Sequence, residues 1–211
     1  MGIVIPKTDR VVVRQADFAA YLALLRGSGD NPGSRIAYDG ELLEIMSPSK
    51  DHERYKILFD QLIGLLAIEW GLIVEPTGSM TLTVEPRGAE PDSSYYVDND
   101  EFKTNSLQLD LAREPAPDLV VEIDLSRERL DKRSIYASIG VTEFWRYDGK
   151  ELRAFYLTNG RYEAIVASTL LEGLPISTMS EFLELRLTHS RNVLLESWQR
   201  WLRENRPAER L

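Results

Sequence analysis

The sequence contains no cysteine. Disulfide bonds, thiolate zinc sites and a cysteine nucleophile are therefore excluded, and a reducing cytoplasm is the simplest location. The sequence also lacks an apolar run approaching the roughly 20 residues that a membrane-spanning helix needs. Its first residues, MGIVIPKTDR, do not show the basic and then apolar regions of a signal peptide. We therefore expect a cytoplasmic protein that does not span a membrane.

The sequence has few basic residues relative to acidic ones. It contains 25 lysine and arginine residues and 34 aspartate and glutamate residues, which gives a net charge of −9. Proteins that hold nucleic acid by releasing counterions usually present a basic face. The acidic total therefore argues against tight non-specific binding, although segregated charges would still permit it. Divalent cations held by carboxylates would supply positive charge only where a phosphate must lie.

The composition is that of a globular protein, with 43% hydrophobic and 28% charged residues. The length suits a single domain over residues 1–211. Apolar spacing and turn residues indicate the order helix, hairpin, long helix, several strands, helix, strands and helix. This order predicts a mixed α/β (α+β) fold, with a mixed central sheet flanked by helices.

Helical spacing is strongest over 50–70 and 191–204. In the first of these helices, the apolar residues expected to pack on the sheet are Ile57, Leu58, Leu62, Leu65 and Leu66. Shorter helices are predicted over 17–26 and 127–138. Strands are predicted over 35–47 as a hairpin, within 72–84, and over 93–97, 118–124, 142–148 and 152–168, the last as a hairpin turning at Asn159-Gly160. The polar segment 98–117 is expected to form a lid or a surface loop.

Two carboxylates lie in or beside apolar strand sequence. Asp92 follows a proline at a strand entry, and Glu122 lies inside a run of aliphatic residues. A buried carboxylate is costly unless a cation pairs with it. Hard oxygen ligands of this kind favour Mg²⁺ or Mn²⁺ over zinc. Two carboxylates would also leave coordination positions open for water and phosphate, as phosphodiester hydrolysis requires.

Strand geometry selects among the acidic residues. Asp118, Glu122 and Asp124 project from the same strand face. Asp118 is roughly 13 Å from Glu122 along the strand, which is too far to share an ion, whereas Asp124 is about 7 Å away and could help. Directly opposed side chains on neighbouring strands are about 5 Å apart. Asp92 and Glu122 are therefore the primary metal pair, and Asp118 is assigned to the turn that enters the strand.

Four segments taken together form a recognisable pattern. They are YDGELLEIMSPSKDHERYKILFDQL at 38–62, EPD at 90–92, PDLVVEI at 117–123 and KRSIYASIGVTEFWRYD at 132–148. The most specific part is a lysine, a tyrosine four residues later and then GV-x-E-[FY]-W-x-x-D. With this pattern, most of the chain resembles a large bacterial family of restriction-endonuclease-like proteins within the PD-(D/E)XK nuclease superfamily. The resemblance implies the restriction-endonuclease-like fold.

The resemblance also implies roles for individual residues. Asp92 would be the aspartate of the first motif and Glu122 the acid of the second, both as catalytic metal ligands. The superfamily lysine normally follows that acid by two positions, where this chain has Asp124. In this family the next helix is thought to supply the lysine, which gives Lys132 as a catalytic residue. The approach to it, DLSRERLDK, is several residues shorter than is usual in the family.

Two further accessory residues follow from the same resemblance. Tyr136 lies four residues after Lys132, so the two would share a helix face that looks back at the metal. His52, at the start of the long helix, matches a recurrent histidine of the family and would line the same cleft. The implied function is a Mg²⁺- or Mn²⁺-dependent DNA endonuclease that hydrolyses phosphodiester bonds.

The sequence leaves alternatives open. A salt bridge from Glu122 to Arg129 or Arg133 would also explain a buried glutamate. A catalytically inactive nuclease-fold module that binds nucleic acid or protein is favoured by Asp124 in the usual lysine position and by the acidic charge. A housekeeping role unrelated to nucleic acid rests on the net charge alone. We also expect a homodimer, because the C-terminal helix carries Trp198 and Trp201 and many related folds cut duplexes as two-fold dimers.

Overall fold

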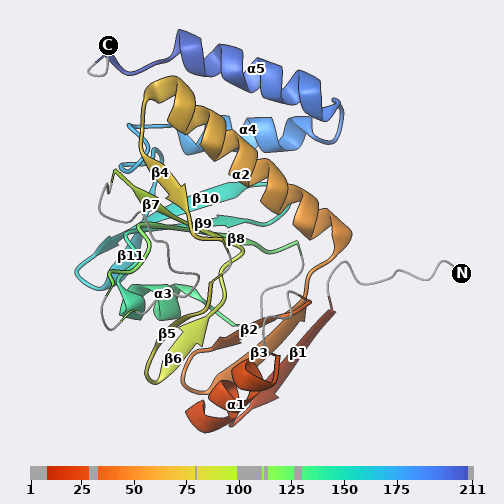
Figure 1. Cartoon of the computed structure of the whole chain (residues 1–211), viewed down its shortest axis with the longest axis vertical. Helices are drawn as coiled ribbons and strands as arrows, with labels where there is room; N and C mark the ends of the chain where they lie inside the picture. Colours follow the sequence, from red (N-terminus) through yellow and green to blue (C-terminus); the bar gives the residue numbers. More distant parts are fainter. Residues whose placement is uncertain are drawn as a thin grey trace, which may run out of the picture.

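The computed structural model describes residues 9–28, 33–78, 80–98, 111, 114–125 and 130–208. In these residues the chain forms two sheets and five helices (Figure 1). The five-stranded sheet has the order β1-β3-β2-β6-β5 and comprises β1 (Asp9–Arg14), β2 (Arg35–Tyr38), β3 (Leu42–Ser47), β5 (Leu82–Val84) and β6 (Arg87–Ala89). All of its pairings are antiparallel.

The six-stranded sheet has the order β11-β10-β9-β8-β7-β4. Its strands are β4 (Val74–Pro76), β7 (Ser93–Val97), β8 (Leu119–Ile123), β9 (Glu143–Tyr147), β10 (Leu152–Thr158) and β11 (Arg161–Ile165). The pairing of β8 with β9 is parallel and the other pairings of this sheet are antiparallel. The mixed α/β fold is therefore confirmed, with a second sheet beside the mixed one.

The helices are α1 (Phe18–Ser28), α2 (Lys50–Trp70), α3 (Arg133–Ile139), α4 (Ile176–Leu185) and α5 (Arg191–Glu204). Helices α2, α4 and α5 lie on one side of the six-stranded sheet, and α3 and the five-stranded sheet lie on the other (Figure 1). The alternation of β8 agrees, because Leu119, Val121 and Ile123 pack with the α2 side and Val120 packs with α3. The side chains of Glu122 and Asp124 follow Val120 and therefore project between the two sheets.

Helix α2 has the predicted bounds. The side chain of Ser49 caps it by accepting the N–H of His52 at 3.2 Å, and Gly71 ends it in the left-handed conformation. The prediction that Ile57 packs on the sheet is wrong, because this side chain is 53% exposed. The buried positions are instead His52, Tyr55, Leu58, Phe59, Leu62, Ile63, Leu66 and Trp70. Tyr55, Phe59 and Trp70 are the three aromatic residues of this buried face, which excludes Ile57.

Other boundaries differ from the sequence prediction. The helix expected over 127–138 begins only at Arg133, because Asp131 accepts the backbone N–H of Arg133 at 3.1 Å in a local turn. Residues 127–129 of that prediction lie outside the described residues, as does most of the segment 98–117 that was expected to form a lid or loop. Within the described ranges, none of the helices has both the length and the apolar character that crossing a membrane requires.

Candidate metal centre

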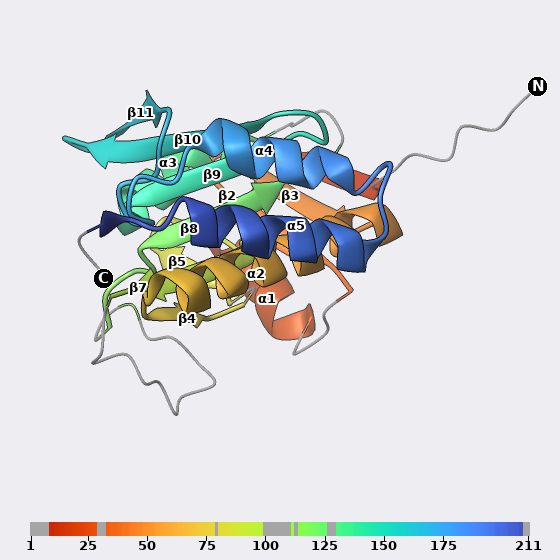
Figure 2. The same ribbon diagram turned by 90° about the horizontal axis from the view of Figure 1, so that it is seen from above.

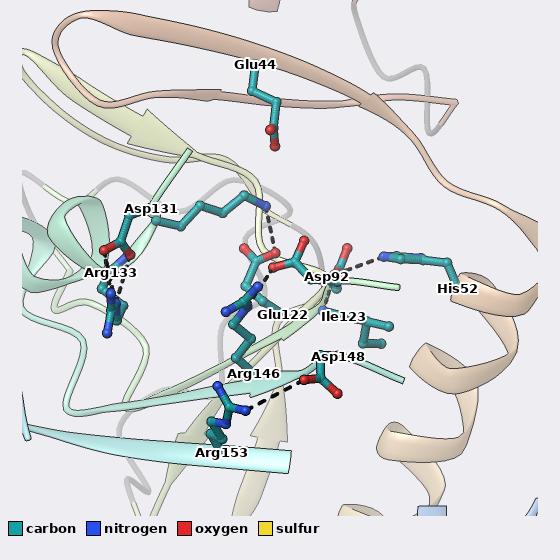
Figure 3. Close-up of polar contacts among 12 residues, drawn as sticks. Glu44, His52, Asp92, Glu122, Ile123, Asp131, Arg133, Arg146, Asp148 and Arg153 are labelled. Carbon is teal, nitrogen blue, oxygen red and sulfur yellow. Dashed lines mark hydrogen bonds and ion pairs between the residues drawn. The ribbon is translucent and has the colours of Figure 1, made fainter. Parts of the chain in front are cut away.

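Strands β7 and β8 bring the two candidate ligands together. The strands are antiparallel with Ser93 opposite Val121, so continuing the register by one residue sets Asp92 beside Glu122. Both side chains are buried, at 0% and 1% exposure. Figure 3 shows the Asp92 and Glu122 side chains in the same region, with His52 directed at Asp92 from α2. Lys132, directly before α3, contacts Glu122. Strand pairing therefore positions both acids at one point between the sheets.

Glu122 is held by two donors from one face of the α3 segment. Lys132 Nζ lies 2.6 Å from Glu122 Oε2, and the Tyr136 hydroxyl donates to Glu122 Oε1. Lys132 is itself only 3% exposed and Tyr136 is fully buried. The helical spacing of Lys132 and Tyr136 thus directs both polar groups to one carboxylate.

Burial dominates the electrostatics of this pair. It raises the pKa of Glu122 to about 8, because the attraction of Lys132 does not offset burial together with the negative charges of Asp92 and Asp124. Burial alone would lower the pKa of Lys132, but the charges of Glu122, Asp92 and Asp124 outweigh it and the pKa is raised. Lys132 is therefore charged, and burial makes ionising Glu122 costlier than ionising an exposed glutamate.

Asp92 has a different environment. Its Oδ2 accepts the backbone N–H of Ile123 at 2.7 Å and lies 3.0 Å from His52 Nε2, a close contact without the alignment of a hydrogen bond. Burial would raise the pKa of Asp92, but His52 and Lys132 outweigh it and the pKa is lowered. Correspondingly, burial would lower the pKa of His52, but the Asp92 carboxylate outweighs it and the pKa is raised. Asp92 is therefore ionised.

One oxygen of this ionised group has no partner. Asp92 Oδ1 is buried and accepts no hydrogen bond from any described residue. Buried polar atoms are nearly always satisfied, and leaving an anionic oxygen unsatisfied is costly. A cation bound between Asp92 and Glu122 would satisfy this oxygen. The arrangement of donors therefore fits a metal ion.

The donor set also indicates which metal would fit. Across the described ranges no group of three or more histidine, cysteine, aspartate or glutamate side chains gathers in a metal-binding arrangement. Two carboxylate ligands with the remaining positions left to water and phosphate are typical of Mg²⁺ sites. A structural zinc site would need four protein ligands. The centre therefore suits Mg²⁺ or Mn²⁺ held by Asp92 and Glu122.

Asp124 belongs to a neighbouring network that links the two sheets. Arg10, on β1, donates to Asp124 Oδ1 and lies 3.1 Å from Glu44 on β3, while Arg146 Nε on β9 lies 3.1 Å from Asp124 Oδ2. Asp124 and Glu44 are buried. Each oxygen of Asp124 thus already has a guanidinium partner, and the charge of this carboxylate is compensated within the chain.

Sequence reasoning missed Arg10, Glu44 and Arg146. Glu44 did carry a signal, because it lies on the same face of its strand as Leu42 and Met46 and is therefore a glutamate at a buried position. Arg10 and Arg146 carried none. The sequence left open a salt bridge from Glu122 to Arg133. In the structure Glu122 pairs with Lys132, and Arg133 donates to Asp131. Arg129 lies outside the described residues.

Comparisons with known proteins indicate a family and a fold for this chain. Residues 18–190 match the model of the Uma2 family, described as "Putative restriction endonuclease". Among solved structures, the chain is similar to a protein from Anabaena variabilis ATCC 29413, titled "putative nuclease belonging to DUF820". The TM-score is 0.50 at 14% sequence identity, covering 87% of this chain and 99% of that one. A comparison with curated proteins gives no match. The structural similarity concerns the fold.

Proposed function

Because the chain belongs to the Uma2 family, we propose that it is a metal-dependent nuclease that hydrolyses phosphodiester bonds of DNA at Asp92 and Glu122. The observation that carries the proposal is the buried Asp92 Oδ1, an anionic oxygen that accepts no hydrogen bond within the described part of the chain and lies beside a second buried carboxylate. A structural ion pair would satisfy its own oxygens, whereas a metal centre leaves them for the ion.

Each side chain has a distinct part in this proposal. Asp92 and Glu122 would hold Mg²⁺ or Mn²⁺, which when bound activates a water and neutralises charge on the phosphate. Tyr136 and Lys132 hold the Glu122 carboxylate through its two oxygens, and His52 lies against Asp92. The Lys132 ammonium is also the buried cation beside the pair, so it would stabilise the negative charge that grows on the phosphate.

The second candidate function is a nuclease-fold module without turnover that binds nucleic acid or protein. The observation that favours it is Asp124, which occupies the usual position of the superfamily lysine and is compensated by Arg10 and Arg146. The net charge of −9 points the same way, because tight DNA binding usually requires a basic face. A direct assay separates the two functions.

The assay is cleavage of mixed DNA substrates at low salt with Mg²⁺ or Mn²⁺. Lys132→Ala should lower the cleavage rate about 10²- to 10³-fold while leaving metal binding mostly intact, because its charge acts in the transition state. Glu122→Gln should weaken metal binding itself, since it removes an anionic ligand. Lys150→Ala, which removes the same charge from the exposed turn before β10, should cleave like the wild type.

Thermal melting of each variant shows whether a loss of cleavage reflects unfolding. If wild type and variants are equally inert while DNA still binds, the module without turnover is the better account. If neither cleavage nor DNA binding appears with either metal, the proposal of a nucleic-acid function is contradicted.

A further inference from the structure

A hollow of about 450 Å³ lies between α2 and α5, at the end where α4 connects to α5. The two helices run side by side in the view of Figure 2. Its lining residues are Arg54, Ile57, Leu58 and Gln61 of α2, Arg186 and His189 of the connection, and Arg191 and Leu194 of α5. The four α2 residues are spaced at three and four positions and so form one helix face. The hollow is separate from the metal centre. His52 contacts Asp92 from the other side of the first turns of α2.

The charge of this hollow is opposite to that of the whole chain. Three of its lining residues are arginines, and none of the described lining residues is a carboxylate. Asp51 is the carboxylate at its edge, at 3.1 Å from Arg186 and 3.5 Å from Arg54. In a chain with 34 acidic and 25 basic residues, this local excess of positive charge stands out. It indicates an anionic ligand.

Two of the three guanidinium groups are held in place by neighbouring side chains. The guanidinium of Arg186 lies over the ring of Tyr55 at 4.4 Å, and Arg191 Nε donates to Gln61 Oε1 at 2.9 Å. Between them, Ile57 remains 53% exposed and forms an apolar floor with Leu58 and Leu194. Fixed arginine forks match the oxygens of phosphate, and an apolar floor suits the sugar or base attached to it.

We propose that this hollow binds a backbone phosphate of a nucleic-acid strand, with the adjoining nucleotide against Ile57. The inference rests on the proposed nuclease function, which gives the class of ligand. It identifies a surface where this acidic protein holds DNA away from the bond that is cleaved. The first turns of α2 connect the two places, because His52 contacts Asp92 while Asp51 and Arg54 meet the hollow. A strand that reaches the metal centre is thereby held at a second point.

The test is binding of the single-stranded tetranucleotide of deoxythymidine in EDTA, where no cleavage is expected. NMR spectra of the arginine Nε–Hε groups should show shifts for Arg54 and Arg191 on titration. The double variant Arg54→Gln/Arg191→Gln should bind about tenfold more weakly, as charge-assisted contacts to phosphate are lost. The slope of log affinity against log salt should become shallower by about 1.4, the value for two lost contacts on a single strand.

Arg203→Gln is the matched control. It removes the same charge from the same helix about 18 Å further along, where Arg203 pairs with Glu69. This variant should bind like the wild type. Arg186 is left unchanged because its stacking on Tyr55 also supports the fold.

The inference is overturned if the Arg54 and Arg191 signals stay fixed, or if the double variant binds like the wild type, even where the wild type cleaves DNA. Conversely, a wild type that binds the tetranucleotide at these arginines but never cleaves DNA supports this site and contradicts the nuclease proposal. The two failures are therefore distinguishable.

Discussion

Two glutamates on neighbouring strands show how differently a buried carboxylate can be held. Glu143 on β9 is fully buried and accepts hydrogen bonds from Trp145, Ser168, Thr169 and Leu170, all of them neutral donors. Glu122 on β8 has two donors, and one of them is a charged lysine. Neutral donors that fill both oxygens tie a loop to a strand. Charged groups around two carboxylates, one of which has an oxygen without a hydrogen bond to the described residues, are typical of a functional site.

The raised pKa of Glu122 predicts a pH-dependent stability difference between the metal-free wild type and Glu122→Gln. The pKa rises from its ordinary 4.5 to about 8, so the folded protein binds this proton more tightly than the unfolded chain. Relative to the variant, the free energy of unfolding of the wild type should be highest below pH 4.5 and should fall as pH rises to 8. The total loss should be on the order of a few kcal/mol.

Urea denaturation in EDTA across this range measures the difference. Glu41→Gln, at an exposed turn, is the control and should run parallel to the wild type. A difference between wild type and Glu122→Gln that stays constant between pH 4.5 and 8 would show that Glu122 is ionised throughout and that its burial is fully compensated.

At the scale of elements, Arg10 of strand β1 links the five-stranded sheet to Asp124, next to the metal centre. Arg10 is only 8% exposed and bridges buried Glu44 to buried Asp124, which follows β8. Arg10→Ala should lower the free energy of unfolding by about 3 kcal/mol or more, because it leaves buried charges without their partner. Arg14→Ala, an exposed arginine of the same strand, should change it little.

A double-mutant cycle with Glu44→Ala checks the cause. The coupling energy between Arg10 and Glu44 should be about 0.5 to 3 kcal/mol if they act as one network. Additive effects of the two substitutions in the same denaturation experiment would indicate that β1 is held by its backbone pairing with β3 instead.

The elements that the sequence predicted well have local signals. Helices α2 and α5 have the predicted bounds because apolar periodicity and serine caps coincide there. Strand β1 was missed because its pattern is inverted: Val11 and Val13 are largely exposed while Arg10 points inward. Strand β6 and helix α4 were also missed. Such elements depend on packing between distant segments, which a local pattern does not contain.

The same division applies to the candidate site. Strand period and pairing distance were enough to predict that Asp92 and Glu122 would lie together, because both depend on one pair of neighbouring strands. Helical spacing likewise grouped Lys132 with Tyr136. The contacts of Arg10 and Arg146 with Asp124 could not be predicted, since they depend on how the five-stranded sheet meets the six-stranded one.

At the scale of the whole molecule, the structure changes the argument for a homodimer. Trp198 is fully buried and stacks on Trp201, and its Nε1 donates to the backbone of Leu62 in α2. These rings therefore complete the interior of one chain, and the aromatic character of α5 no longer points to a partner. The homodimer remains a prediction from the two-fold symmetry of duplex DNA.

Sedimentation equilibrium at micromolar concentration measures the oligomeric state. A mass near 48 kDa, about twice the 24.1 kDa of the chain, is the expected result. A mass that stays at 24.1 kDa both with and without duplex DNA would contradict the homodimer.

The central claim is that Asp92 and Glu122 hold a divalent cation. A crystal soaked in Mn²⁺ and measured for anomalous scattering tests it most directly, because manganese reveals its own position. We expect a peak within about 2.5 Å of Asp92 Oδ1 and of a Glu122 carboxylate oxygen, the range of metal–oxygen bonds. The peak should disappear in Asp92→Asn and persist in Glu143→Gln. No peak at this position, with Lys132 still bound to Glu122 and Asp92 Oδ1 still without a partner, would contradict the claim.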